Sequence, residues 1–271
     1  MQYTRITFLK PVVFYDDTSK GADFGFADFK DETYFRKVTF EYKADFNKAN
    51  FRKRADFFDT DFESEAHFSR VGFEGFTYFG YTNFKGETNF SNTVFDSIAN
   101  FSFVNFFANT DFQNSTFTGK LDFSVAFFGT ALNLSYAQFH SEVLLDGAKL
   151  PSYLNLYKVK EIAKELDFTY CRLDSTPKCQ INLLRSNIEK IRINYELFEL
   201  AFPKDAKFSD TIQVYERLLD KLKSDGNLVD YELFDIDYRD IVAQKKGGID
   251  LWFSKFQKWW WRYGYSPGRV F

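Results

Sequence analysis

The side chains best suited to catalysis or metal binding are few in this sequence. Two histidines, His67 and His140, and two cysteines, Cys171 and Cys179, occur among 271 residues. Structural zinc sites need cysteines and histidines clustered at short spacings, and a nucleophilic cysteine needs a neighbouring base. The seven residues between the two cysteines match no such pattern. We therefore expect two reduced structural thiols, no metal site and no other cofactor.

Carboxylates are plentiful, and paired carboxylates can act as a general acid and a general base. Here, however, Asp45, Asp56, Asp61 and Asp111 each stand directly before a phenylalanine, in a place that recurs along the chain. A recurring place indicates a structural origin, so we expect these side chains to face solvent. His67 occupies the same place, and His140 stands directly after Phe139. Because the glycines also form no phosphate-binding motif, we expect that the chain is not an enzyme.

The last 25 residues have a different composition, rich in tryptophan and in basic residues. Tryptophan rings settle at headgroup depth in a bilayer, and nearby cations are attracted to anionic lipids. This composition is typical of a segment that lies on a membrane surface, although a tryptophan-rich plug packed on the rest of the chain would share it. The membrane-interface candidates are Trp252, Lys255, Lys258, Trp259, Trp260, Trp261 and Arg262.

Bulk charge identifies no partner. The chain has 35 lysines and arginines, 38 aspartates and glutamates and a formal net charge of −3, so nucleic-acid binding is not expected. Between Lys43 and Arg54 five cations stand with one acid, which predicts a basic patch. No apolar run is long enough to span a bilayer, and the first residues lack a secretory pattern. We expect a cytoplasmic chain, held at the inner face of the membrane if its tail binds there.

Phenylalanine accounts for 37 of the 271 residues and is spaced regularly. From Phe24 to Leu156 a phenylalanine or leucine returns at alternating steps of five and six residues almost throughout, which gives twelve periods of eleven. A compact residue usually stands two places before it. Side chains two residues apart lie on one face of an extended segment, so each unit places one small and one large side chain inside. An amphipathic helix would need steps of three and four.

A short extended piece followed by a corner fits this spacing. Its repetition winds the chain into a tube that is filled by its own side chains. Each buried phenylalanine contributes about 1.5–3 kcal/mol, so such an interior needs no ligand and leaves no internal cavity. The structural ladder of the predicted tube includes Phe46, Phe51, Phe57, Phe62, Phe84, Phe101, Phe112 and Phe123.

The segments Ala44–Lys48, Ala49–Lys53 and Ala99–Phe103 carry the pattern most clearly. They resemble pentapeptide repeats, in which alanine, then aspartate or asparagine, then leucine or phenylalanine precede two variable residues. The resemblance implies a mainly β fold, a right-handed quadrilateral β-helix with four repeats per coil. The six-residue steps are similar to a phenylalanine-rich subset with about 22 residues per coil, whose extra residue we expect at the corners as a bulge or wider turn.

The two ends of the repeat are less regular. Residues 6–14 read as a strand or an irregular cap, with Pro11 as a breaker. Past Leu156 the spacing weakens but continues to near Leu200, and residues 174–178 predict a loop or insertion. At the usual spacing between strands this length corresponds to roughly eight coils.

Beyond the repeat the apolar period changes to three and four, which predicts helices over 209–224 and 228–244. These helices would cap the last coil. Alternatively, the helices would form a homo-oligomer interface, because Tyr231, Phe234 and Tyr238 supply more aromatic surface than a cap requires. The predicted domains are 1–203 for the pentapeptide-repeat β-helix, 204–246 for the helical hairpin cap and 247–271 for the Trp-rich basic amphipathic tail.

The runs Tyr215–Leu219, Asp225–Asn227 and Tyr263–Arg269 look like the linker that precedes membrane helices, often of ion-channel-like type, in phenylalanine-rich pentapeptide-repeat proteins. The resemblance implies a non-enzymatic scaffold that binds an unknown protein partner and forms the cytosolic part of a membrane-associated protein. Other members of the family mimic DNA and bind gyrase, which requires an extended negative surface. Residues 1–156 hold 15 cations and 20 acids, a balance of −5. This modest balance, together with the basic patch, disfavours the gyrase alternative.

Overall fold

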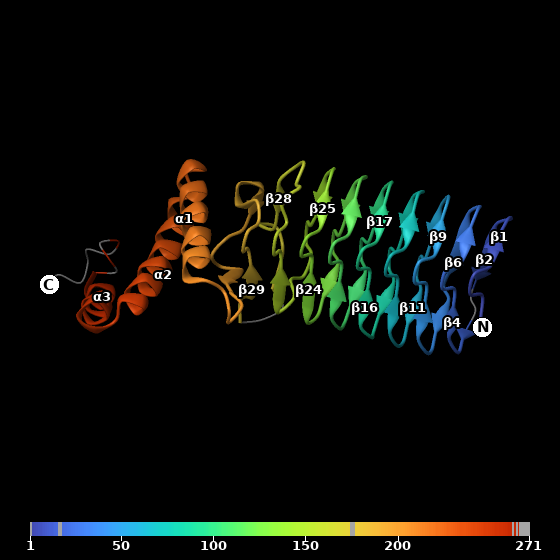
Figure 1. Ribbon diagram of the computed structural model, residues 1–271, viewed down its shortest axis with the longest axis horizontal. Coiled ribbons are helices and arrows are strands. Elements are labelled where there is room, and N and C mark those ends of the chain that lie inside the picture. The colour runs from blue at the N-terminus through green and yellow to red at the C-terminus, as the bar shows by residue number, and fades with distance from the viewer. Residues whose placement is uncertain (1, 16–17, 174–176, 262, 264, 266–271) are drawn as a thin grey trace. The chain divides into compact units, whose positions relative to one another are not determined.

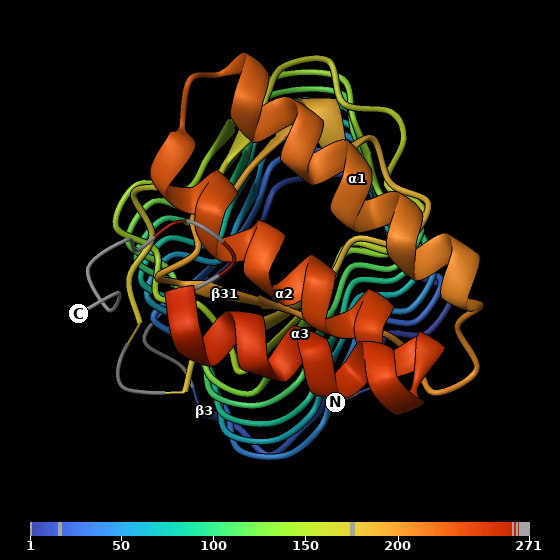
Figure 2. The same cartoon turned by 90° about the vertical axis from the view of Figure 1, so that its left-hand side faces the viewer.

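The computed structural model describes residues 2–15, 18–173, 177–261, 263 and 265. The chain forms two compact units, Met1–Ala201 and Phe202–Phe271. The first is a β-solenoid of stacked coils, in which very short strands alternate with corners (Figure 1). The second consists of three helices. Seen along the solenoid axis, successive coils superimpose on one another (Figure 2).

Four parallel sheets form the sides of the solenoid, and each regular coil adds one strand to each sheet. Sheet 1 contains β1 (Thr7–Phe8), β5 (Asp28–Phe29), β9 (Asn50–Phe51), β13 (Gly72–Phe73), β17 (Val94–Phe95), β21 (Thr116–Phe117) and β25 (Gln138–Phe139). Sheet 2 contains β2 (Val12–Tyr15), β6 (Thr33–Arg36), β10 (Ala55–Asp56), β14 (Thr77–Tyr78), β18 (Ala99–Asn100), β22 (Leu121–Asp122) and β26 (Val143–Leu144).

Sheets 3 and 4 complete each coil. Sheet 3 contains β3 (Thr18–Ser19), β7 (Thr39–Phe40), β11 (Asp61–Phe62), β15 (Asn83–Phe84), β19 (Asn105–Phe106) and β23 (Phe127–Phe128). Sheet 4 contains β4 (Ala22–Asp23), β8 (Ala44–Asp45), β12 (Ala66–His67), β16 (Thr88–Asn89), β20 (Thr110–Asp111), β24 (Ala131–Asn133), β27 (Tyr153–Asn155), β29 (Cys179–Asn182) and β31 (Phe198–Leu200). A short pair, β28 (Leu166–Asp167) and β30 (Ile191–Arg192), belongs to the last coils.

The interior consists of stacked phenylalanine rings. Phe57 and Phe79, one coil apart, stack with their ring centroids 4.6 Å apart, and Phe57 meets Phe46 of its own coil edge to face at 5.6 Å. Both arrangements are favourable for aromatic pairs. The small residues that precede the rings, such as Ala44 and Thr77, are buried in columns of their own. The predicted pair of inward side chains per unit is therefore confirmed.

The corners are of two kinds, which explains the alternating steps. In a five-residue step the chain makes a tight turn, in which the second residue after the ladder phenylalanine has a positive φ. Lys48, between Phe46 and Phe51, has a φ of 58°. In a six-residue step, such as Phe51 to Phe57, one more residue makes a wider corner. The expected wider turn is thus present, and it occurs at every second corner.

The solenoid has about nine coils, one more than the sequence predicted. The additional coil is the N-terminal segment that we interpreted as a strand or irregular cap. Phe8 stacks on Phe29 at 4.8 Å, and Phe14 stacks on Phe35 at 5.1 Å. The sequence carries a signal for this coil, because Tyr3, Phe8 and Phe14 already follow steps of five and six.

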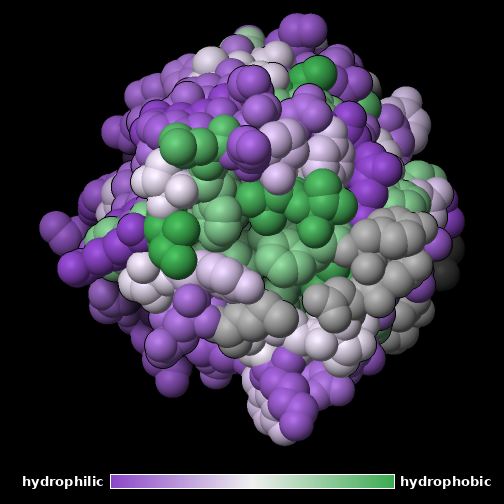
Figure 3. All heavy atoms as spheres, turned by 90° about the vertical axis from the view of Figure 1, so that its right-hand side faces the viewer, coloured by the Kyte–Doolittle hydropathy of each residue, from purple (hydrophilic) through white to green (hydrophobic). Residues whose placement is uncertain are grey.

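The N-terminal end of the solenoid is apolar. Apolar side chains gather near the middle of this end (Figure 3), and Ile6, Leu9 and Val13 are 40%, 76% and 65% exposed. Among the residues that the structure describes, β1, β2 and β3 are the last strands of their sheets on this side. An end with unpaired strand edges and apolar side chains is the part of a solenoid that a capping element covers.

Past Leu156 the coils lose their constant length, yet their interior remains apolar. Strand β27 pairs with β29 across 27 residues, whereas β29 pairs with β31 across 19. Leu183, Ile193 and Phe198 are still buried, and a short 3₁₀ helix, η1 (Ile188–Lys190), makes one corner. Residues 174–176 of the predicted loop lie outside the described residues.

The second unit contains α1 (Phe208–Ser224), α2 (Leu228–Lys246) and α3 (Gly248–Trp261), which pack as consecutive pairs. Asn227 caps α2 by accepting a hydrogen bond from the Asp230 amide at 3.2 Å. Gly247, with a φ of 69°, separates α2 from α3. In the part of the chain that the structure describes, none of these helices has the length and apolar character needed to cross a bilayer.

Candidate functional site

The candidate site predicted from the sequence lies on α3, where three aromatic side chains form an exposed stripe. Trp252, Phe256 and Trp259 are 67%, 42% and 63% exposed. They stand one and two helical turns apart and therefore share one face of the helix. The rings of Trp252 and Phe256 stack with centroids 5.8 Å apart, and Trp259 lies 6.3 Å from Phe256. We call these three residues the aromatic stripe.

Cations border the aromatic stripe. Lys255, on the neighbouring side of α3, is exposed. Lys258 forms an ion pair with Asp240 of α2, and the Tyr263 hydroxyl donates a hydrogen bond to the other oxygen of that carboxylate at 2.7 Å. Burial, together with the nearby Asp240 carboxylate, raises the pKa of Tyr263 to about 12, so this hydroxyl keeps its proton at neutral pH. These contacts fix α3 to α2 and leave the stripe facing outward.

The structure brings together only some of the predicted membrane-interface residues. Trp252, Lys255 and Trp259 lie on the exposed side of α3. The backbones of Trp260 and Trp261 belong to the helix, but their side chains and the whole of Arg262 lie outside the described residues. The sequence analysis did not single out Phe256, although its spacing of four from Trp252 and three from Trp259 is a helical signal.

The predicted structural ladder is entirely internal. Each of its eight members is at most 1% exposed, so the ladder can support the walls of the solenoid but cannot contact a partner. The buried residues are Phe46, Phe51, Phe57, Phe62, Phe84, Phe101, Phe112 and Phe123.

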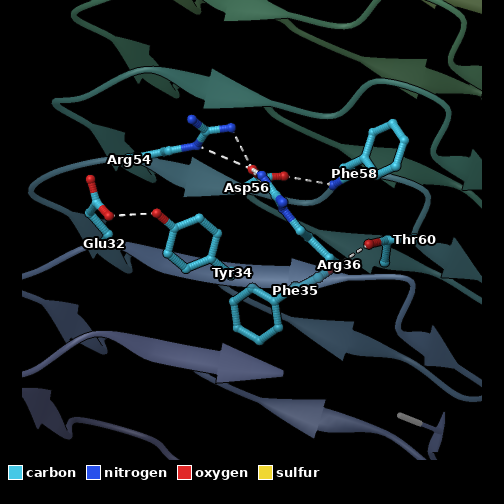
Figure 4. Close-up of polar contacts among 8 residues, drawn as sticks. All are labelled: Glu32, Tyr34, Phe35, Arg36, Arg54, Asp56, Phe58 and Thr60. Atoms are coloured by element: carbon cyan, nitrogen blue, oxygen red, sulfur yellow. Dashed lines mark hydrogen bonds and ion pairs between the residues drawn. The ribbon is translucent and has the colours of Figure 1, made fainter. Parts of the chain in front are cut away.

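The outer wall of sheet 2 carries a compact charged cluster (Figure 4). Asp56, at 0% exposure, accepts hydrogen bonds from the guanidinium groups of Arg36 and Arg54 at 2.6 and 2.7 Å. Both arginines also lie over the Tyr34 ring. Asp56 was expected to face solvent, but the two arginines cover it. Because its charge is fully paired, this carboxylate has a structural role.

The predicted basic patch is neutralised in the same way. Its five cations are contributed by Lys43, Lys48, Arg52, Lys53 and Arg54. Four of them form ion pairs, and two of these, Arg52 and Lys53, reach acids in an adjacent coil. The fifth, Lys48, lies 4.6 Å from the centre of the Phe26 ring, where a cation–π interaction is favourable. Pairing across coils is invisible in sequence because the partners are 20 or more residues apart.

The other acidic positions also have a structural use. In sheets 2 and 4 an aspartate or asparagine before the ladder residue accepts the backbone N–H two residues later, as Asp45 does from Asn47 at 2.9 Å. This interaction closes the tight corner and explains the preference for aspartate and asparagine. Within the described part of the chain no cluster of histidine, cysteine and acidic residues suits a metal ion.

The two cysteines are separate and buried. Cys171 is 7% exposed and Cys179 is 1% exposed, and neither forms a disulfide. Burial disfavours the thiolate and raises the pKa of each thiol to about 12. Such thiols are poor nucleophiles at neutral pH.

The aromatic residues considered for an oligomer interface take part in packing within the helical unit. Phe234 is 1% exposed. Tyr238 is half-buried, lies 6.1 Å from the Tyr215 ring and donates a hydrogen bond to Glu216 at 3.2 Å. Tyr231 is half-buried as well.

Comparison with known proteins gives no relative. No family model, no curated protein and no solved structure matches this chain. The geometry of the two units must therefore carry any proposal about function.

Proposed function

We propose that this chain is a non-enzymatic scaffold of the phenylalanine-rich pentapeptide-repeat type, whose solenoid wall binds a protein partner and whose α3 helix holds it on the inner face of a membrane. The roughly nine coils and the stacked rings support the scaffold role, because they give a stiff wall whose interior is filled by side chains. The observation that carries the membrane role is the exposed aromatic stripe on α3.

The stripe has the chemistry of a membrane-surface element. Tryptophan and phenylalanine rings exposed on one helical face can insert at headgroup depth, while Lys255 remains close to anionic headgroups. Transfer of the three rings from water to the bilayer interface favours binding, by at most about 1.5–3 kcal/mol for each ring, because each is already partly covered. A helix of this kind lies in the plane of the interface and does not span the bilayer.

Vesicle flotation tests the membrane role. The full chain is mixed with phosphatidylcholine vesicles that either contain or lack phosphatidylserine. We expect the chain to float with both, and more strongly with the anionic vesicles. Replacing Trp252, Phe256 and Trp259 together by serine should lower the bound fraction by about tenfold or more, because the apolar contact area is lost.

A matched control removes three exposed aromatic rings from the solenoid, Tyr42, Tyr81 and Tyr170, which are 61%, 47% and 69% exposed. This variant should float like the original chain. Equal flotation of the stripe variant and the control, or no flotation of the original chain, would contradict the membrane role.

The DNA-mimic alternative is weakened by the pairing of charges on the wall. A gyrase-binding mimic needs a long unneutralised negative surface, whereas acids such as Asp28, Asp31 and Glu63 form ion pairs with cations of their own or adjacent coils. We therefore expect no effect of the protein on DNA supercoiling by gyrase. Inhibition in that assay, or protection of gyrase from a drug, would favour the alternative.

A further inference from the structure

A surface cavity of about 380 Å³ lies on the outer wall of sheet 3, towards the C-terminal end of the solenoid. Its volume is within the range of small-molecule pockets. Side chains from four successive coils surround it. The lining residues are Asn105, Phe107, Val125, Phe127, Gly147, Lys149 and Arg172.

The cavity begins where a regular column of polar side chains stops. On the outside of sheet 3, Asn83 donates a side-chain hydrogen bond to Asp61 at 2.7 Å, and Asn105 donates one to Asn83 at 2.8 Å. The next three places in register belong to Phe127, Lys149 and Arg172. An aromatic ring and two cations therefore replace the amides at this point.

Two phenylalanine rings form one side of the cavity. Phe107 is 48% exposed, and its ring centroid lies 5.6 Å from that of Phe127. The Lys149 ammonium lies 5.8 Å from the centre of the Phe127 ring. The rings thus offer an apolar surface next to positive charge.

Gly147 makes room for a guanidinium group at the other side. A Cβ atom at Gly147 would lie 2.9 Å from an Nη atom of Arg172. The glycine has a φ of 69°, but the same corner accepts Tyr81, Phe103 and Val125 at positive φ in earlier coils. Backbone conformation alone therefore does not require glycine here, and a Cβ atom at this position would displace the flexible end of the Arg172 side chain.

Arg172 has no carboxylate partner among the described residues of the solenoid. In the described part of the chain its guanidinium forms neither a hydrogen bond nor an ion pair. Arg36, Arg52 and Arg54, in contrast, each contact a carboxylate. Lys149 stands next to Arg172 in register, on backbones about 4.8 Å apart. A second positively charged residue therefore lines the cavity.

We infer that this cavity is a binding site for an aromatic carboxylate, with the carboxylate at Arg172 and Lys149 and the aromatic ring against Phe107 and Phe127. A guanidinium group binds a carboxylate through two parallel hydrogen bonds, which fixes its orientation. Either a free aromatic acid or a peptide that ends in a C-terminal aromatic residue supplies this chemistry. The site lies on the solenoid and does not depend on the membrane role of α3.

Ligand-observed NMR with the full chain tests the site. The probes are 3-phenylpropionate, the peptide N-acetyl-Gly-Gly-Phe with a free carboxylate, and the same peptide as an amide. We expect at least one of the two acids to bind and the amide to bind about tenfold more weakly or not at all, because it cannot form the charged pair. Binding of the small acid identifies a free ligand, whereas binding of the peptide acid alone identifies a chain terminus.

Two variants locate the binding. Arg172→Ala removes the guanidinium, and Phe127→Asn replaces the ring by the amide that continues the column from Asn105. Each should weaken binding by about tenfold or more. Arg70→Ala is the control, because Arg70 is another exposed arginine and lies far from the cavity in sequence. Circular dichroism checks that all three variants fold.

Several results would overturn the inference. They are an absence of binding by both acids at concentrations on the order of 10 mM, equal binding of acid and amide, and unchanged binding in the Phe127→Asn variant. That variant keeps the test decisive even if Arg172→Ala does not fold.

Discussion

At the scale of single residues, the side chain before each ladder position does more than face solvent. On sheet 4 it forms a column, in which Asn133 donates to Asp111, Asn155 to Asn133 and Asn182 to Asn155, at 2.9–3.0 Å. Asp111 also accepts a hydrogen bond from the backbone N–H of Gln113 at 2.8 Å. As the only carboxylate in this run of four, it is the one member that can lose a proton.

Replacing Asp111 by asparagine should stabilise the protein in a pH-dependent way. Burial raises the pKa of the Asp111 carboxyl above its ordinary 3.8, and the two hydrogen bonds offset this only in part. The folded chain therefore holds the proton more tightly than the unfolded chain, so stability falls as pH rises from about 3.8 through the raised pKa. Urea unfolding of both proteins should show that Asp111→Asn is more stable at pH 7 and that its advantage shrinks near pH 4.

The asparagine would also extend the column, because its amide could donate to Asn89, its partner in the preceding strand. Asp61→Asn serves as the control, since Asp61 lies on sheet 3 and already accepts from Asn83. An Asp111→Asn variant that is less stable than the original at pH 7 would refute the idea that ionisation is costly here.

A second prediction at this scale concerns the tight corners. Val125 has a φ of 57°, which costs a β-branched residue about 1–2 kcal/mol. Val125→Asn should raise the free energy of unfolding by about 1 kcal/mol, because asparagine adopts this conformation readily. Denaturant unfolding measures the change. Val94→Asn is the control, since Val94 is an exposed valine in a regular strand, and a similar gain there would attribute the effect to surface polarity.

At the scale of elements, strands of two residues are stable only because they pair with strands of the adjacent coils. Each strand has too few hydrogen bonds of its own, and the stacked side chains connect one coil to the next. The coils past Leu156, which vary in length, should therefore be the place where local opening begins. Cys171 and Cys179 report on this region.

We predict that both thiols react with iodoacetamide about a hundredfold more slowly in the native protein than in urea at pH 8. Burial excludes the reagent, and a pKa of about 12 leaves almost no thiolate. Mass spectrometry of the labelled peptides measures the two rates separately. Labelling of Cys171 at the rate of the unfolded chain would show that these coils are open in solution.

At the scale of the whole molecule, the solenoid is a repeating unit whose period is the coil. Deleting residues 80–101 removes 22 residues, connects Phe79 to Phe106 across a five-residue step and retains the order of tight and wide corners. We expect this protein to fold with one coil fewer and to unfold cooperatively, because every remaining strand keeps a partner in its own sheet.

The matched deletion of residues 80–96 also keeps a five-residue step, from Phe79 to Phe101, but places two tight corners in succession. From the deletion onward, strands that belong to sheet 2 would then occupy the position of sheet 3. Tight corners with a positive φ would therefore stack against wide corners of the neighbouring coil. Thermal unfolding followed by circular dichroism should show a much lower or broadened transition. If both deletions unfold alike, corner type does not determine register.

Much of the architecture follows from local features of the sequence. Steps of five and six residues between large apolar side chains exclude helices and long strands, and the change of period near Phe208 marks the helical unit. The spacing of Tyr3, Phe8 and Phe14 follows the same steps and indicates a first coil. Their rings stack on Phe24, Phe29 and Phe35 of the next coil, which establishes it. The composition of the tail likewise indicated an aromatic surface on α3. It did not indicate that Phe256 belongs to the aromatic stripe.

By itself, the sequence determined that this chain winds into a filled tube, because burial of one small and one large side chain per step is a property of neighbouring residues. Only the tertiary structure decided that Asp56 is enclosed by two arginines, that the basic patch is neutralised and that Phe107, Phe127 and Arg172 share a cavity. These features depend on which residue of one coil lies above which residue of the next. Register between coils is set by corner lengths summed over some 20 residues, so no local pattern contains it.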